Sequence, residues 1–356
     1  MFVALRDLRF ARGRFALIAS VVALITVLVG FLSGLTGGLA TQNVSAVLDL
    51  PADRLVFSAP GPGDSGPSFS DSSVTEQQTE AWASTPGVLA AEPIGISQTR
   101  AEAGDTRAAI AVFGVPPGFS GTGPTDDDAL SLSVPAADAL GVTLGDEVVI
   151  AGTTYTVESV AGDGWYSHTP LVQMTLPAWQ ALAASTGSPD AYATVLAVTG
   201  DPDWSATDAT TTTMSQTPLA SLTALSAFRS EIGSLLLMVA MLFGISALVI
   251  GAFFTVWTMQ RRADIAVLKA LGASTASLVR DALGQALVVL VLGIGVGLLV
   301  VAGAGSLAGS ALPFLLSPLT TLLPGAIMIV LGLAGAAFAL RSVTSADPLT
   351  ALGSNR

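Results

Sequence analysis

The sequence predicts an α-helical integral membrane protein with four transmembrane helices and an α+β extracytoplasmic domain between helices 1 and 2. Three observations support this fold class. Of the 356 residues, 51% are hydrophobic and 11% are charged, about half the charged fraction of a soluble domain. Four segments are apolar over the roughly 20 residues that a membrane helix needs. Charge is also segregated, because residues 41–231 hold 22 acidic and 4 basic side chains, whereas the rest of the chain holds 4 and 10.

The four apolar segments define the predicted spans. The first, 15–39, carries no charged residue. A cleaved signal peptide is the alternative, but this apolar run is longer than the usual core of about 7–15 residues. The second has its apolar run over 232–259, and we expect its helix to extend outward to residue 219 as a stalk, about 60 Å long in all. The third and fourth are predicted at 282–307 and 319–341.

Basic residues decide the predicted orientation, because Lys and Arg beside membrane helices stay on the cytoplasmic side. Here they precede the first span and follow the second and fourth, at Arg6, Arg9, Arg12, Arg14, Arg261, Arg262 and Arg341. We therefore expect a multi-pass plasma-membrane protein with both termini in the cytoplasm. Residues 1–14, 260–281 and 342–356 would be cytoplasmic, and residues 40–218 and 308–318 would lie outside.

The segment between the first two spans has the composition of a small folded domain. Residues 41–228 are rich in Pro, Gly, Ser and Thr, and apolar runs at 108–115 and 148–160 predict strands. Gly152 interrupts the second run, which indicates a hairpin. Residues 75–84 and 177–184 are predicted to form short helices. The result is a mixed α+β domain.

Glycine pairs in two spans match a membrane-helix packing pattern. Gly30 with Gly34, and Gly293 with Gly297, have the small-xxx-small spacing that lets helix backbones approach closely. The chain contains 37 glycines, so chance matches to this spacing are expected.

Composition excludes several kinds of site. There is no Cys, so disulfides and thiolate metal sites are absent, and the chain lacks the glycine-rich phosphate loop that ends in Lys-Ser/Thr. No nucleophile motif or catalytic triad is present, and the bases are too few for nucleic-acid binding. His168, the single histidine, is either a metal or haem ligand or a loop residue beside aromatic side chains. Asp126, Asp127 and Asp128 form either a hard-cation site or a solvated acidic loop.

Three motifs resemble a known family. Residues 260–274 read QRRADIAVLKALGAS, residues 346–352 read ADPLTAL, and residues 140–148 read LGVTLGDEV. Together they resemble the permeases of the MacB/FtsX/LolC superfamily of ABC systems, whose topology also matches the predicted spans. Asp264 stands where the family usually has Glu, which is a mild departure.

The resemblance implies a separate ATPase partner. Ile265, Leu268 and Leu271 have helical spacing and predict a short amphipathic helix in the cytoplasmic loop. In this superfamily such a helix couples to an ABC ATPase subunit, and two permeases pair with two ATPases that hold ATP and Mg²⁺. The chain by itself would then not be an enzyme, because ATP would be hydrolysed by the separate ATPase subunit. A surface helix without a partner is the alternative. The expected coupling residues are Arg261, Arg262, Asp264, Leu268, Lys269, Leu271 and Gly272.

Two further segments resemble the HrtB-type haem exporter permeases. They are GWYSHTPLV at residues 164–172 and PAWQAL at residues 177–182. This resemblance implies haem as the transported ligand, with no cofactor of the chain's own.

Glu231 is the residue that we expect to contact this cargo. A carboxylate at the end of an apolar span is expensive and marks a functional position by default, and an anionic oxygen can ligate ferric haem iron. Helical spacing places Ser234, Leu235 and Met238 on the same side, and pairing of two protomers would bring two copies of Glu231 together. The alternative is a hydrated carboxylate at the head-group boundary, or one paired with Arg229.

The sequence thus predicts the permease subunit of an ABC exporter that removes haem, or a similar amphipathic molecule, from the membrane. ATP-driven closure of the partner would push on the loop 260–275, and the second span would carry the motion outward. Two alternatives stay open. One is a transmembrane signal transmitter of the FtsX type, which acts on an extracytoplasmic partner. The other is an exporter of antibiotic peptides or lipids.

Overall fold

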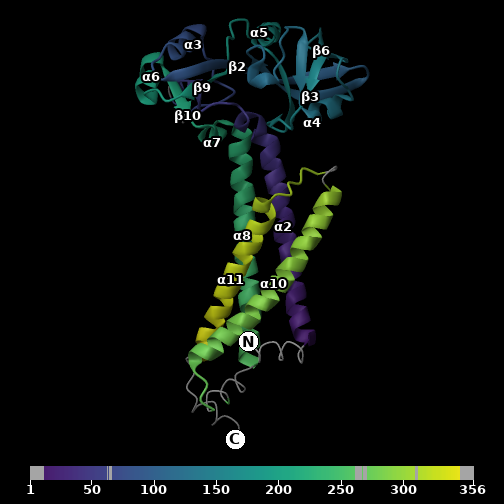
Figure 1. Cartoon of the computed structure of the whole chain (residues 1–356), viewed down its shortest axis with the longest axis vertical. Coiled ribbons are helices and arrows are strands. Elements are labelled where there is room, and N and C mark those ends of the chain that lie inside the picture. The colour runs from purple at the N-terminus through teal and green to yellow at the C-terminus, as the bar shows by residue number, and fades with distance from the viewer. Residues whose placement is uncertain are drawn as a thin grey trace. The chain divides into compact units, whose positions relative to one another are not determined.

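The computed structural model describes residues 12–61, 63, 66–260, 267, 271–308 and 312–344. The chain divides into two compact units, which are described separately. We call residues 39–233 the α+β unit, and residues 1–38 with 234–356 the helical unit. Figure 1 shows the elements of both.

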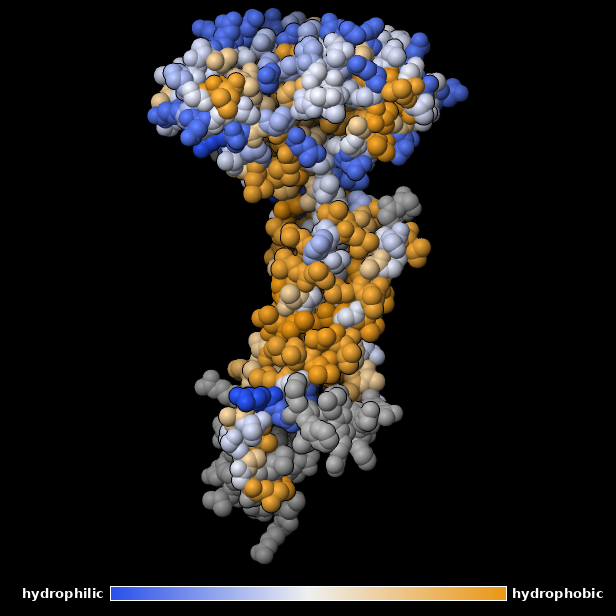
Figure 2. All heavy atoms as spheres, in the orientation of Figure 1, coloured by the Kyte–Doolittle hydropathy of each residue, from blue (hydrophilic) through white to orange (hydrophobic). Residues whose placement is uncertain are grey.

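Four long helices are apolar enough to cross a membrane. They are α2 (Arg12–Leu48), α8 (Ser226–Gln260), α10 (Thr275–Ala308) and α11 (Pro318–Thr344), and hydrophobic residues cover them in Figure 2. The α+β unit is inserted between the first and second of them. The prediction of four spans with an α+β domain between helices 1 and 2 is therefore confirmed.

The helix ends differ from the predicted ones in three places. Helix α2 continues past residue 39 to Leu48. Helix α10 begins at Thr275, inside the predicted loop 260–281, and the Ser274 hydroxyl accepts the Ser277 backbone N–H of its first turn. The prediction of one helix from residue 219 is wrong. Residues there form the short helix α7 (Pro218–Ser221) and a 3-10 turn, η2 (Leu222–Ala224). The extended, buried Leu225 then interrupts the helix before α8 starts.

Glycines let the helices of the helical unit approach closely. A Cβ added at Gly293 would lie 2.9 Å from Val22 Cβ, and one added at Gly297 would lie 2.5 Å from Thr26 Cβ. Both distances are too short for any larger residue. Gly293 and Gly297 therefore lie at a close contact between α10 and α2. This pair does pack helices together, as the small-xxx-small spacing predicts.

The α+β unit is built on one ten-stranded sheet system. Its strands are β1 (Arg54–Ser58), β2 (Val88–Ala103), β3 (Thr106–Val115), β4 (Ala129–Leu132), β5 (Glu147–Ile150), β6 (Thr153–Val160), β7 (Trp165–Tyr166), β8 (Thr169–Thr175), β9 (Val195–Gly200) and β10 (Thr213–Gln216). The pairing order is β10-β1-β9-β2-β3-β8-β4-β6-β5, and β7 pairs with β8. Strand β5 also pairs with β2. The six strands β2, β3, β8, β4, β6 and β5 therefore close into a barrel.

Helices cover the two parts of this sheet system. Helix α3 (Glu76–Ala83) and helix α6 (Trp204–Thr211) pack beside the β1, β9 and β10 part, and α4 (Val134–Leu140) and α5 (Leu176–Ser185) pack on the barrel strands. One buried cluster fills the barrel around Ile110, Leu130 and Met174. The strands predicted at 108–115 and 148–160, and the helices predicted at 75–84 and 177–184, are all present.

The segment LGVTLGDEV forms a tight connection between α4 and β5. Gly141 ends α4 in the left-handed conformation with φ 69°, which suits glycine because it lacks a Cβ. The Asp146 carboxylate accepts hydrogen bonds from the Thr143 N–H at 2.7 Å and from the Thr143 hydroxyl at 3.0 Å. These bonds lower the pKa of Asp146, so the motif acts locally as a closed turn.

Asp146 leads to a prediction about acid stability. In the folded protein the pKa of Asp146 lies below its ordinary value of 3.8, which is also its value in the unfolded chain. Ionised Asp146 therefore stabilises the fold fully above pH 3.8, and this stabilisation is lost as the pH falls through the pKa of the folded protein. We expect Asp146→Asn to remove this acid-dependent part of the stability. The measurement is hydrogen-exchange protection of β5 from about pH 6 to about pH 3, corrected for intrinsic exchange rates. Asp105→Asn, in the exposed β2–β3 turn, is the control. An Asp146→Asn profile equal to that of wild type would contradict the prediction.

Candidate functional site

A two-residue turn between β7 and β8 carries the single histidine. Ser167 and His168 both have positive φ, 48° and 63°, which is the pattern of the tight type I′ hairpin turn. That turn usually holds Asn or Gly, so Ser and His at both of its central positions are unusual. The turn is bound to the last turns of α2. The Ser167 N–H donates to the Asn43 carbonyl at 2.9 Å, and the His168 N–H donates to the Gln42 carbonyl at 3.0 Å.

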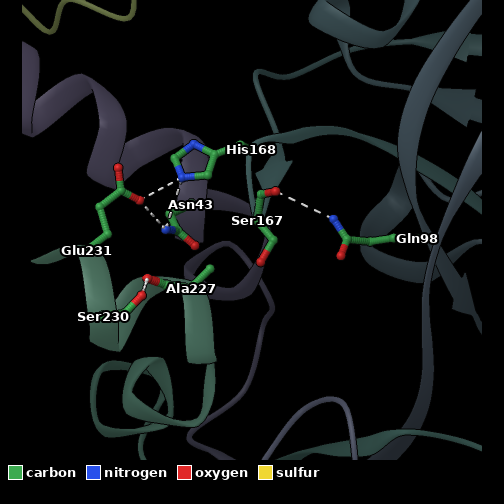
Figure 3. A network of polar contacts seen from close by, with 7 residues as sticks. All are labelled: Asn43, Gln98, Ser167, His168, Ala227, Ser230 and Glu231. Atoms are coloured by element: carbon green, nitrogen blue, oxygen red, sulfur yellow. Dashed lines mark hydrogen bonds and ion pairs between the residues drawn. The ribbon is translucent and has the colours of Figure 1, made fainter.

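Three polar side chains meet at this turn (Figure 3). The Nε2 atom of His168 lies 2.7 Å from Glu231 Oε2, and the Nδ2 of Asn43 donates to the same oxygen at 3.2 Å. Asn43 Nδ2 and His168 Nε2 are 3.3 Å apart. The three residues come from α2, the β7–β8 turn and the first turns of α8, and all three belong to the α+β unit. We call them the polar cluster.

The chemistry of the polar cluster follows from its donors and acceptors. An ionised carboxylate can only accept, so the short contact with Glu231 requires a proton on Nε2 of His168. The side chains of His168 and Glu231 are 35% and 29% exposed, which leaves them reachable from solvent. Asn43 is 1% exposed, and its Oδ1 is buried without a hydrogen-bond partner among the described residues. The cluster therefore offers a carboxylate, an imidazole and an unused acceptor.

The structure changes the interpretation of two predicted residues. His168 does follow a buried aromatic residue, Tyr166, but it also contacts Glu231, which the loop interpretation did not foresee. Glu231 has His168 and Asn43 as partners, whereas the sequence suggested Arg229 or water. Asn43 was missed altogether, because nothing in its local sequence indicates that residues 125 positions apart would meet.

The apolar residues predicted beside Glu231 follow it on α8. Ser234 and Met238 are exposed, and Leu235 is half-buried. Their spacing of three, four and seven residues from Glu231 places them along one face of a continuous helix.

The acidic loop at 126–128 is a structural connection. The hydroxyl of Thr175, which caps α5, donates to the Asp127 carboxylate, and the Thr156 N–H donates to the Asp128 carbonyl at 2.8 Å. Within the described ranges, no group of three His, Cys, Asp or Glu side chains is placed to hold a metal ion. The side chains of all three aspartates are exposed.

Two of the predicted coupling residues can be placed. Leu271 is 79% exposed, and its N–H donates to the Val267 carbonyl at 3.0 Å. Gly272 follows at φ 93°, a conformation that ends a helix and suits glycine. Arg261, Arg262, Asp264, Leu268 and Lys269 lie outside the described residues.

Similar proteins extend along the whole chain. Residues 235–348 match the model of the FtsX-like permease C-terminal domain. The chain is 23% identical to a Staphylococcus epidermidis protein that carries the name of a hemin transport system permease, HrtB. It is 25% identical to an uncharacterized ABC transporter permease of Mycobacterium bovis. Each match covers 99% of this chain and 99% of the relative.

Solved structures also resemble part of the chain. One of them is the extracellular domain of the ABC-type transporter YknZ from Gram-positive bacteria. The match covers 44% of this chain and 87% of that one, with 18% identity and a TM-score of 0.33.

Proposed function

Because residues 235–348 are similar to FtsX-like permeases and the whole chain is similar to ABC transporter permeases, we propose that it is the membrane subunit of an exporter that removes haem from the membrane. A permease of this type implies an ATPase partner subunit. In our proposal the ATPase is a separate chain, and two permeases pair with two ATPases that bind ATP and Mg²⁺. Both termini and the loop 260–281 face the cytoplasm, and the α+β unit faces outward.

The observation that carries the proposal is the polar cluster. Ferric haem is a flat apolar molecule whose iron takes a nitrogen or anionic oxygen ligand. Glu231 and His168 offer both kinds of ligand, side by side and half-exposed. The exposed face of α8 that follows, with Ser234, Leu235 and Met238, supplies an apolar wall for the macrocycle. The relatives named for hemin transport support the same substrate.

The cluster also fixes the position of the Glu231 carboxylate. His168 and Asn43 both hydrogen-bond the same oxygen, Oε2, and these two bonds fix the position of the carboxylate beside the imidazole. Since the β7–β8 turn is bound to α2 and Glu231 lies on α8, the cluster joins the outer ends of the two helices that enter the α+β unit. Movement of α8, driven by the ATPase through the loop 260–275, would disturb the cluster and release the cargo.

Haem titration of the purified permease–ATPase complex tests the proposal. We expect wild type to produce a new Soret band, and Glu231→Ala to weaken haem binding by roughly 10–100-fold, as when a group that supports a metal site is removed. Asp105→Ala removes one exposed carboxylate in the β2–β3 turn and should leave the titration unchanged.

Two negative outcomes have different meanings. A wild-type complex without a Soret change would end the haem proposal and favour the FtsX-like signal transmitter, or an exporter of peptides or lipids. An unchanged affinity in Glu231→Ala, with a normal wild-type band, would leave haem as the cargo and remove only the assignment of Glu231.

A further inference from the structure

We propose that a serine-lined cavity at the start of α8 binds the zwitterionic head group of an outer-leaflet phospholipid, with Arg229 on the phosphate and Asp71 on the amine. The cavity has a volume of about 270 Å³ and lies wholly within the α+β unit. Five of its lining residues are serines, namely Ser58, Ser68, Ser70, Ser72 and Ser226. Among the residues that the structure describes, Arg229 and Asp71 are the only charged ones that line it.

A second cavity lies next to this one. That cavity, of about 190 Å³, shares Ser70, Ala224 and Ser226 with the first and reaches Tyr166 and Ser167. The first cavity alone, at about 270 Å³, is larger than a single ion needs, and the serine hydroxyls offer both donors and acceptors. It therefore suits a polar group of several atoms, such as the phosphoethanolamine part of a lipid.

Arg229 is available to a ligand. Among the residues that the structure describes, its guanidinium has no ion-pair or hydrogen-bond partner. Two of the other bases in this unit are already engaged, because Arg54 stacks on Trp204 at 4.8 Å and Arg107 pairs with Glu102 at 3.0 Å. A guanidinium binds phosphate through two parallel hydrogen bonds, which is the strong form of this contact.

Asp71 decides which head group fits. An isolated Arg in a serine-lined cavity would suit any anion, but a carboxylate in the same wall repels a purely anionic ligand. A head group that carries both a phosphate and an ammonium satisfies both side chains. The net charge of −18 over residues 41–231 also opposes anions approaching from a distance, although salt screens that field beyond about 8 Å.

The position of Arg229 along α8 favours a lipid as the source of this group. The uncharged run from residue 232 to residue 260 is about 43 Å long at 1.5 Å per residue. A bilayer is about 40–45 Å thick when its head-group layers are included. Arg229, just outside this run, is therefore at the level of the outer head groups. Since residues two apart on a helix face different directions, the cavity is distinct from the site at Glu231, and the proposal does not depend on haem.

Native mass spectrometry of the full chain in detergent tests the proposal, with phosphatidylethanolamine as the titrated lipid. We expect Arg229→Gln to lower the affinity of one tightly bound lipid about tenfold, the effect of losing charge-assisted hydrogen bonds. Asp71→Asn should weaken phosphatidylethanolamine but not phosphatidylglycerol, which has no amine. Ser70→Leu, which fills the junction of the two cavities without changing the charge, should weaken both lipids.

Arg107→Gln is the matched control, because it removes an exposed Arg that does not line the cavity. Equal lipid affinity in Arg229→Gln and Arg107→Gln would overturn the site. Glycerophosphoethanolamine, which lacks acyl chains, is the competitor that tests the source. Competition as effective as that of the whole lipid would overturn the lipid assignment and identify a soluble ligand instead.

Discussion

Replacement of Trp179 by alanine is expected to destabilise the α+β unit by about 3–5 kcal/mol, the cost of deleting a large buried aromatic side chain. Trp179 lies on α5, is 4% exposed, and donates from Nε1 to the Ser97 hydroxyl at 2.9 Å. Its indole packs over Gly95 and Gly114, which face each other across β2 and β3. A Cβ at either glycine would overlap the ring, and the two glycines themselves have no side chain to fill the space that Trp179 leaves.

Hydrogen exchange of the full chain measures this effect through the protection of β2 and β3. Leu89→Ala is the control, because Leu89 lies on the same β2 strand but is 85% exposed and should change protection little. Gly114→Ala should also lower protection, because the added methyl displaces the indole ring. Normal protection in Trp179→Ala would show that α5 does not stabilise the barrel strands.

Replacement of Gly297 by leucine is expected to separate α10 from α2 and to cost about 1–3 kcal/mol or more, the range for overpacking a tight contact. A Cβ at Gly297 would lie 2.8 Å from the Ala23 carbonyl oxygen as well as 2.5 Å from Thr26 Cβ. The Ala23 oxygen is backbone and cannot move without bending α2. In a membrane the apolar solvent gives little drive for helix association, so close packing at small residues must supply it.

The same helix supplies two matched controls. Gly295 and Gly303 have no atom within 4 Å of an added Cβ among the described residues, so Gly295→Leu and Gly303→Leu should be tolerated. Thermal unfolding of the detergent-solubilised chain, followed by circular dichroism, compares the three variants. A Gly297→Leu protein as stable as the controls would show that the α2–α10 contact rearranges at no cost.

The signals that predicted the fold are local and strong. An uninterrupted apolar run near 20 residues has few alternatives to a membrane helix, and the segregation of charge placed the polar domain between the first two spans. Within that domain, alternating β-branched residues around Gly152 predicted the β5–β6 hairpin. A Thr-x-x-Gln capping box at Thr75 and Gln78 starts α3, as its sequence signature would suggest.

Local signals failed where tertiary contacts compete with them. We expected the helix of the second span to continue outward to residue 219 as a stalk, but burial of Leu222 and Leu225 in the core of the α+β unit ends the helix there. The segment PAWQAL was interpreted as a family signature, and the structure shows the packing reason for its tryptophan. In both cases long-range packing explains what local propensity could not.

By itself, the sequence determined the four spans, the inserted α+β domain and the unusual position of Glu231 at the end of an apolar run. Only the tertiary structure decided what Glu231 contacts. Asn43 and His168 lie 188 and 63 residues away from it in the chain, and neither the period of a helix nor that of a strand reports on such separations. The β7–β8 turn brings them together because its backbone is hydrogen-bonded to α2. The polar cluster is therefore a product of how the hairpin packs against the two helix ends.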